Sequence, residues 1–276
     1  MAEQDLITSA RAAFARRDWP AARLGLLTAR TTTDLELQDL DALAEATWWL
    51  GNIPESLSVA EELYRGLTAG GDRPAAAMKA IVLSLQWGMR GDLMVASGWL
   101  NRARRLLQDL PERPEHGYLL YLESAMSLDL EEDPGPAQAA ADQLDSLARR
   151  LADPTLGCFA RVLAGLAGVR AGRTEDGFSD LDEAMLPVLA GDVAPVWSGD
   201  IYCTVIHLCH QLGDLARMRA WTDALEHWTA GQSANFVYTG VARVHELQLV
   251  SAEGGWDAVE RELGVLSTDV RNVRRG

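Results

Sequence analysis

Residues 42–65 read ALAEATWWLGNIPESLSVAEELYR and contain one short turn, Gly51-Asn52, between two stretches of helical character. Asn52 has a short polar side chain that can accept a hydrogen bond from the free amides at the start of a helix. Pro54 follows it, and proline is favoured in the first turn of a helix, where its missing N–H costs nothing. The segment therefore predicts two helices joined by a tight turn.

The same small turn recurs along the whole chain. Its glycine-equivalent positions are Arg17, Gly51, Gly91, Glu132, Gly172, Gly213 and Gly254. Successive positions lie 34, 40, 41, 40, 41 and 41 residues apart. A nearly constant period of this length is typical of repeat architectures, in which one helical unit stacks on the next. Each turn is expected to begin the second helix of a pair.

Small residues flank these turns at fixed distances. Most positions seven residues before the turn and five residues after it are small, namely Ala10, Ala44, Ser84, Ala125 and Gly165 before it and Ala22, Ser56, Ala96, Ala137 and Gly177 after it. Two helix backbones approach closely only where side chains are small, so these residues are predicted to face the partner helix. No segment alternates with the period of two that strands require. The fold is predicted to be all-α.

The composition argues against several functional classes. The formal net charge of −15, from 25 Lys+Arg and 40 Asp+Glu, repels a phosphate backbone, so we expect no direct nucleic-acid binding. The three cysteines, Cys158, Cys203 and Cys209, are an odd and sparse set that fits a reducing cytoplasm better than a disulfide framework. The longest apolar region, residues 156–171, is interrupted by two arginines and is too short to span a bilayer. The acidic amino end lacks the basic start of a secretory signal, and a cytoplasmic protein without cofactor or membrane contact is expected.

The turn pattern, Leu-Gly or Arg-Gly followed by Asp or Asn with alanine five residues later, resembles the tetratricopeptide repeat. Residues 42–65, 97–124 and 201–228 are also similar to the repeat domains of bacterial LuxR-type transcriptional regulators and of some cyclase-linked regulators. The resemblance implies a right-handed α-solenoid of about seven helix-turn-helix pairs over residues 1–267, followed by a short, flexible basic tail at 268–276. The period near 41 departs from the 34 residues of the basic repeat. The chain also stops soon after residue 266, which is expected of either a fragment of a regulator or a stand-alone adaptor.

In such repeats the first helix of each pair lines a concave groove, and the resemblance implies which positions point into it. The positions so identified are Asp41, Glu45, Trp48, Leu85, Met89, Leu122, Met126, Tyr202, His207, His210 and Arg243. The expected groove is apolar in its middle and polar at its ends. It suits an amphipathic peptide, a protein segment or a small effector. A Leu/Met stripe at helical spacing is more often simply core.

Residues 201–214, IYCTVIHLCHQLGD, are the one stretch that resembles a chemical site. Cys203, His207 and His210 share one helical face, so zinc binding or thiol chemistry is an alternative. Three ligands along one helix span about 10 Å, however, and one ion cannot reach all three without a partner helix. Phosphate-loop, HExxH and GxSxG motifs are absent from the sequence.

The sequence therefore predicts a non-enzymatic binding scaffold without catalytic residues. It would act as the sensor or interaction domain of a bacterial transcriptional regulator. A metal- or thiol-dependent enzyme centred on Cys203, and a structural module for self-association, remain alternatives.

Overall fold

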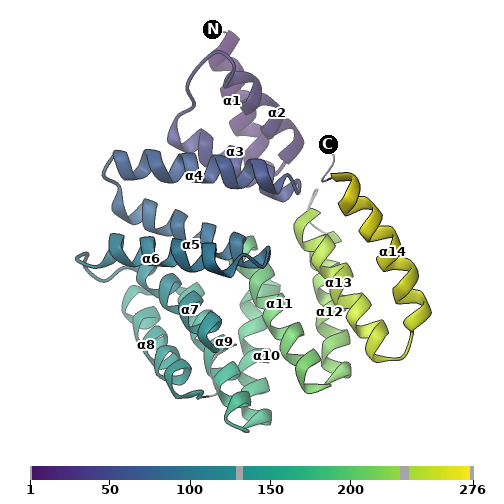
Figure 1. Ribbon diagram of the computed structural model, residues 1–276. Coiled ribbons are helices and arrows are strands. Elements are labelled where there is room, and N and C mark those ends of the chain that lie inside the picture. Colours follow the sequence, from purple (N-terminus) through teal and green to yellow (C-terminus); the bar gives the residue numbers. More distant parts are fainter. Residues whose placement is uncertain (1, 129–132, 231–235, 274–276) are drawn as a thin grey trace. The chain divides into compact units, whose positions relative to one another are not determined.

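The computed structural model describes residues 2–128, 133–230 and 236–273, and these residues form helices, turns and loops without any strand (Figure 1). The prediction of an all-α fold is confirmed. The helices are α1 (Ala2–Ala15), α2 (Trp19–Ala29), α3 (Leu37–Trp49), α4 (Ile53–Ala69), α5 (Arg73–Met89), α6 (Leu93–Leu107), α7 (Pro114–Leu128), α8 (Gly135–Leu151), α9 (Pro154–Arg170), α10 (Thr174–Ala190), α11 (Pro195–Leu212), α12 (Leu215–Ala230), α13 (Phe236–Ala252) and α14 (Trp256–Val273).

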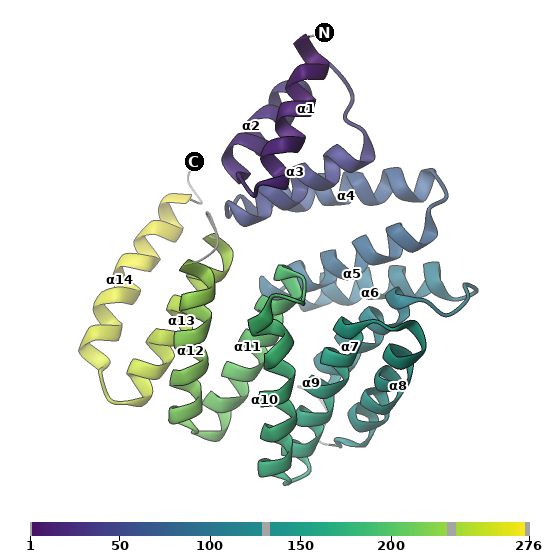
Figure 2. The same cartoon turned by 180° about the vertical axis from the view of Figure 1, so that it is seen from behind.

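The chain forms two compact units, residues 1–195 and residues 196–276. In the first unit neighbouring helices pack in sequence order, and α3 with α4 and α5 with α6 lie side by side in both views (Figures 1 and 2). In the second unit α12 packs on α13, and α13 packs on α14. Helix α14 runs through the boundary at residue 267 that the sequence suggested, and residues 274–276 lie outside the described part of the chain.

The repeated turn has one backbone conformation. The residue at the turn position has a positive φ at Arg17, Gly51, Gly91, Gly172, Gly213 and Gly254, while Glu132 lies outside the described residues. This left-handed conformation ends a helix, and glycine adopts it without steric cost. At each of these six turns the next helix starts two residues later, as at Ile53 after Gly51. The turn register read from the sequence is thus the register of the helix pairs.

Five of the seven residues that directly follow the turn position are Asp or Asn, and three of these five side chains accept a backbone hydrogen bond. The carboxylates of Asp18, Asp133 and Asp214 accept from the amides of Ala21, Gly135 and Arg217 at 3.2, 2.9 and 3.0 Å. Asn52 and Asp92 precede helices but make no such bond. The Asp92 carboxylate lies 3.4 Å from the guanidinium of Arg90 instead.

The small residues beside the turns form the close contacts between paired helices. The hydroxyl of Ser56 donates to the carbonyl of Ala44 at 2.8 Å, and that of Ser84 donates to the carbonyl of Ala96 at 2.9 Å. Gly165 and Gly177 meet so closely that a methyl group on Gly165 would lie 2.7 Å from the carbonyl oxygen of Gly177. The predicted small-residue contacts between paired helices are therefore confirmed at these pairs.

Larger residues fill the space between successive pairs. Trp19 stacks on Trp49 with ring centroids 6.3 Å apart, and Tyr121 stacks on Phe159 at 4.0 Å. One charged pair also joins α1 to α3, because the buried Asp39 carboxylate accepts two hydrogen bonds from Arg11, at 2.7 and 2.8 Å. These contacts hold each pair against the next, from α2 to α3 at Trp19 and between first helices at the other two.

Among the described residues, no helix combines the length and the apolar character that crossing a membrane requires.

Candidate binding surfaces

The eleven residues predicted to line a groove divide into buried and accessible sets. Trp48, Leu85, Leu122 and Tyr202 are buried and belong to the core, so in this structure they present almost no surface to a ligand. Trp48 shows why, since both members of the Trp48-Trp49 pair are at most 4 % exposed. The other seven keep solvent access, namely Asp41, Glu45, Met89, Met126, His207, His210 and Arg243. For these seven a binding role stays a prediction.

The accessible groove positions of the first unit include charged groups with defined partners. Lys79 on α5 contacts the Asp41 carboxylate on α3 at 2.5 Å. The Glu45 carboxylate accepts a hydrogen bond from the indole N–H of Trp49 at 3.2 Å. Desolvation by the surrounding helices raises the pKa of Glu45, although the residue keeps solvent access. This end of the predicted groove is therefore polar, as expected.

The accessible positions of the second unit are also paired. The side-chain amide of Gln211 lies 2.9 Å from Nε2 of His207. Arg243 on α13 contacts Glu246 on the same helix and Glu262 on α14, the latter at 3.0 Å. These pairs keep Arg243 engaged within its own unit.

The alternative centred on Cys203, His207 and His210 finds little support in the geometry. Among the residues that the structure describes, no three His, Cys, Asp or Glu side chains are grouped so as to hold a metal ion. Burial raises the pKa of the Cys203 thiol to about 12, and that of Cys158 to about 12 as well. A thiol with such a pKa stays protonated at neutral pH, whereas thiol chemistry needs the thiolate.

A third histidine, His245 on α13, lies close enough to His207 and His210 of α11 for their charge to act on it, which the sequence did not indicate. His245 on α13 is buried, its Nδ1 lies 3.0 Å from the side-chain oxygen of Gln248, and its Nε2 has no hydrogen-bond partner in the described structure. Burial lowers the pKa of His245, and positive charge on His207 and His210 would lower it further. The pKa of His245 therefore depends on the charge of two other histidines of the second unit.

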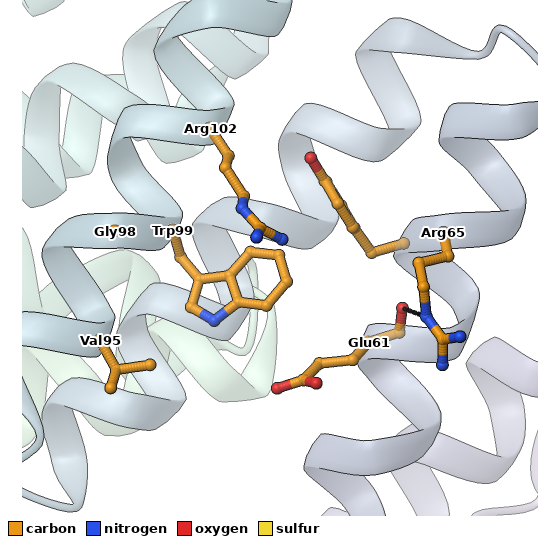
Figure 3. A pocket seen from close by; sticks show the side chains of 7 residues that line it. Glu61, Arg65, Val95, Gly98, Trp99 and Arg102 are labelled. Atoms are coloured by element: carbon orange, nitrogen blue, oxygen red, sulfur yellow. Dashed lines mark hydrogen bonds between the residues drawn. The ribbon is translucent and has the colours of Figure 1, made fainter.

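A hollow in the first unit lies between α4 and α6, the second helices of two successive pairs. It has a volume of about 360 Å³ and is lined by Glu61, Tyr64, Arg65, Val95, Gly98, Trp99 and Arg102. This volume is at the lower end of the range for ligand pockets, roughly 300 to 1,000 Å³. Residues 61–65 come from α4 and residues 95–102 from α6, on opposite sides of the hollow (Figure 3).

An aromatic pair joins the two walls of this hollow. Tyr64 and Trp99 meet edge to face, with ring centroids 4.9 Å apart and planes at 85°. The guanidinium carbon of Arg102 lies 4.5 Å from the Trp99 ring centroid and 5.6 Å from that of Tyr64 (Figure 3). A cation–π contact attracts a guanidinium to a ring and provides no oxygen acceptor for its N–H groups. Arg102 is thus held in place while its donors remain free to bind an acceptor.

The sequence did not indicate this hollow. Its lining residues follow no common spacing from the repeated turn, and Tyr64 and Trp99 are 35 residues apart in sequence (99 − 64). One available signal was the segment NRARR at 101–105, which places three arginines within four positions of a chain with net charge −15. Arginines concentrated on one helix of an acidic protein indicate a local reversal of charge.

No protein-family model matches this chain, and a search of curated proteins gives no match.

Proposed function

We propose that this protein is a non-enzymatic binding scaffold of the tetratricopeptide type. Its helix pairs would be about seven repeats stacked in the right-handed sense of that family. The scaffold would bind a peptide or protein segment and serve as the sensor or interaction domain of a bacterial transcriptional regulator. The regulatory setting rests on the resemblance of residues 42–65, 97–124 and 201–228 to such domains.

One observation carries the proposal, namely that the same left-handed turn recurs at a nearly constant interval and begins a helix two residues later each time. Stacked repeats contact chiefly their neighbours and present extended surfaces that bind partners. The raised thiol pKa values of Cys158 and Cys203 support binding over thiol chemistry.

The test is selection of binders from a random dodecapeptide library displayed on phage, with the full-length chain as bait. We expect enriched peptides with dissociation constants in the micromolar range, on the order of 1 to 100 μM. Native mass spectrometry of the same preparation would show any effector that remains bound during purification. Recovery of no peptide and no bound small molecule would contradict the proposal.

The predicted groove lies on the face formed by the first helices of the pairs, called here the first-helix face. The double variant Met89→Glu, Met126→Glu tests whether this face binds the peptides, because both side chains keep solvent access at predicted groove positions. The matched control is Leu24→Glu, Leu186→Glu, which places the same charges on exposed apolar positions of the second helices α2 and α10. Loss of binding in the first variant alone would assign the selected peptides to the first-helix face.

A further inference from the structure

We propose that the hollow between α4 and α6 binds an acidic segment of a partner protein, whose carboxylates pair with Arg65 and Arg102. This inference rests on the proposed binding function and names the chemistry of the partner and its place. The site lies on second helices and is separate from the groove positions of the first helices.

The charge of the hollow differs from that of the rest of the molecule. Its lining contains two arginines and one glutamate, a local sum of +1 (2 − 1), in a chain whose formal net charge is −15. Such a local reversal of sign attracts acidic groups and disfavours basic partners. Nucleic acid would also meet the two arginines, but the net charge of −15 repels a long phosphate backbone.

Both arginines have donors available for an acceptor. The guanidinium of Arg102 lies against the rings of Trp99 and Tyr64, and no contact with a carboxylate is found for it in the described residues. Arg65 uses its Nε–H for the backbone carbonyl of Glu61 at 3.3 Å, which leaves its two terminal NH₂ groups (Figure 3). A guanidinium binds a carboxylate through two parallel hydrogen bonds, so each arginine can present this pair to a ligand.

The hollow is open, and apolar side chains continue outside it. Four of its seven lining residues, Arg65, Val95, Gly98 and Arg102, are exposed. Next to Val95, Leu93 and Met94 at the start of α6 are 53 % and 87 % exposed. Neighbouring exposed apolar side chains are typical of a protein-binding surface. An extended chain that places a carboxylate in the hollow and an apolar side chain over Leu93 or Met94 uses both features, whereas a small anion would use only the first.

Gly98 allows the hollow to be filled without harm to the fold. A Cβ atom at Gly98 would meet no other atom within 4 Å, so a larger side chain there enters open space. The variant Gly98→Leu should therefore fill the hollow and prevent binding. Gly240 on α13 is the matched control, since a Cβ atom there also meets nothing within 4 Å and Gly240 lies in the other unit.

The experiment uses the full-length chain and two sets of immobilised dodecapeptides. One set alternates Asp or Glu with Leu or Phe, and the other replaces every acid by Lys. We expect the wild-type chain to retain acidic peptides and not the lysine set, with binding that weakens as salt is added. The tightest acidic peptide, labelled with fluorescein, is then titrated by fluorescence anisotropy against the variants.

The variants are predicted to act in opposite directions. Arg65→Met and Arg102→Met should each weaken binding about tenfold or more, as expected for the loss of hydrogen bonds to a charged group. Glu61→Gln should strengthen binding roughly threefold, because it removes a negative charge beside the ligand. Gly98→Leu should abolish binding and Gly240→Leu should leave it unchanged. Thermal unfolding followed by circular dichroism confirms that each variant is folded.

Two results would overturn the inference while leaving the proposed function intact. One is recovery of binders from the random library together with no retention of any acidic peptide at about 1 mM, a concentration that detects even weak complexes. The other is binding of acidic peptides that Arg65→Met, Arg102→Met and Gly98→Leu do not change. Failure of both the random and the acidic sets would contradict the proposed function as well.

Discussion

Single residues at the helix contacts decide how closely two helices of a pair approach. Gly165 on α9 faces Gly177 and Leu181 on α10, and the added methyl group of alanine would lie 2.6 Å from Leu181 Cγ and 2.7 Å from the Gly177 carbonyl oxygen. The side chain of Leu181 can rotate, but the backbone of Gly177 can give way only if the helices separate. Gly165 is therefore required by packing, although glycine weakens a helix.

This contact predicts that Gly165→Ala destabilises the protein by about 1 to 3 kcal/mol, the usual cost of overpacking. Gly98→Ala should instead stabilise it by up to about 1 kcal/mol, because alanine is the better helix former and its methyl group enters open space. Urea unfolding of the two variants measures both values. Equal effects of the two substitutions would mean that α9 and α10 do not approach as closely as the structure has them.

Arg17 occupies the turn position at which most other repeats have glycine. Its φ of 59° lies in the left-handed region, which costs a residue with a side chain roughly 1 kcal/mol or more. Glycine at this position removes the strain, but its greater conformational entropy in the unfolded chain offsets part of the gain. Arg17→Gly is thus predicted to stabilise the protein by about 0.5 to 1 kcal/mol. Gly51→Ala, at a φ of 75°, should destabilise by a similar amount. Differential scanning calorimetry would detect the two opposite shifts in melting temperature.

At the scale of helices, the sequence predicted those features of the fold that depend only on residues close together in the chain. The turn at Gly51 and the start of α4 at Ile53 follow from local rules for turns and first-turn proline. The sequence did not predict which side of α3 would be covered. Trp48 was expected at the groove and is buried, because exposure depends on how the neighbouring pairs pack and not on the spacing within one helix.

The hollow between α4 and α6 was missed for the same reason. Tyr64 and Trp99 meet only because two successive helix pairs stack at a particular spacing, and no local pattern within 61–65 or 95–102 encodes that distance. The arginines of residues 101–105 indicated a charge but not its partner. Contacts between repeats therefore need the structure, whereas contacts within a repeat can be read from small residues such as Ser56 and Ser84.

Helices α11 and α13 should be sensitive to pH through His245. The folded pKa of His245 is lowered by burial, so the unfolded chain takes up a proton first as the pH falls. Stability is then retained above the ordinary value of 6.5 and is lost as the pH falls below 6.5 toward the folded pKa. Nearby His207 and His210 act in the same direction, whereas the hydrogen bond that the side-chain oxygen of Gln248 accepts from His245 opposes it.

The free energy of unfolding of the wild type should therefore fall between pH 7.5 and pH 5.5 by more than that of His245→Gln, because glutamine keeps the polarity and removes the titration. Urea unfolding at both pH values gives the comparison. Glu226, whose pKa is raised by burial, acts in the opposite direction in both proteins and cancels in the difference. If the wild type and His245→Gln lose the same stability, His245 takes up its proton as readily in the folded chain as in the unfolded chain.

At the scale of the whole molecule, stability should be distributed between two units that each have a core. Large side chains that are fully buried occur in both, for example Phe159 in residues 1–195 and Tyr238 in residues 196–276. The hydroxyl of Tyr238 donates to the carbonyl of Val196 at 2.8 Å, within the second unit. Where helices pack mainly on their neighbours in sequence, as in residues 1–195, the chain can be divided without loss of the contacts inside each part.

Residues 1–195, expressed alone, are accordingly predicted to fold into a helical unit with a cooperative urea transition. The fragment retains five of the nine tryptophans, so its unfolding can be followed by fluorescence as well as by circular dichroism. It also contains every residue that lines the α4–α6 hollow. Its affinity for the acidic peptide should therefore equal that of the full-length chain within about twofold, a difference of less than 0.5 kcal/mol. A fragment that binds hydrophobic dyes and unfolds without a sharp transition would show instead that the first unit depends on residues 196–276 for its packing.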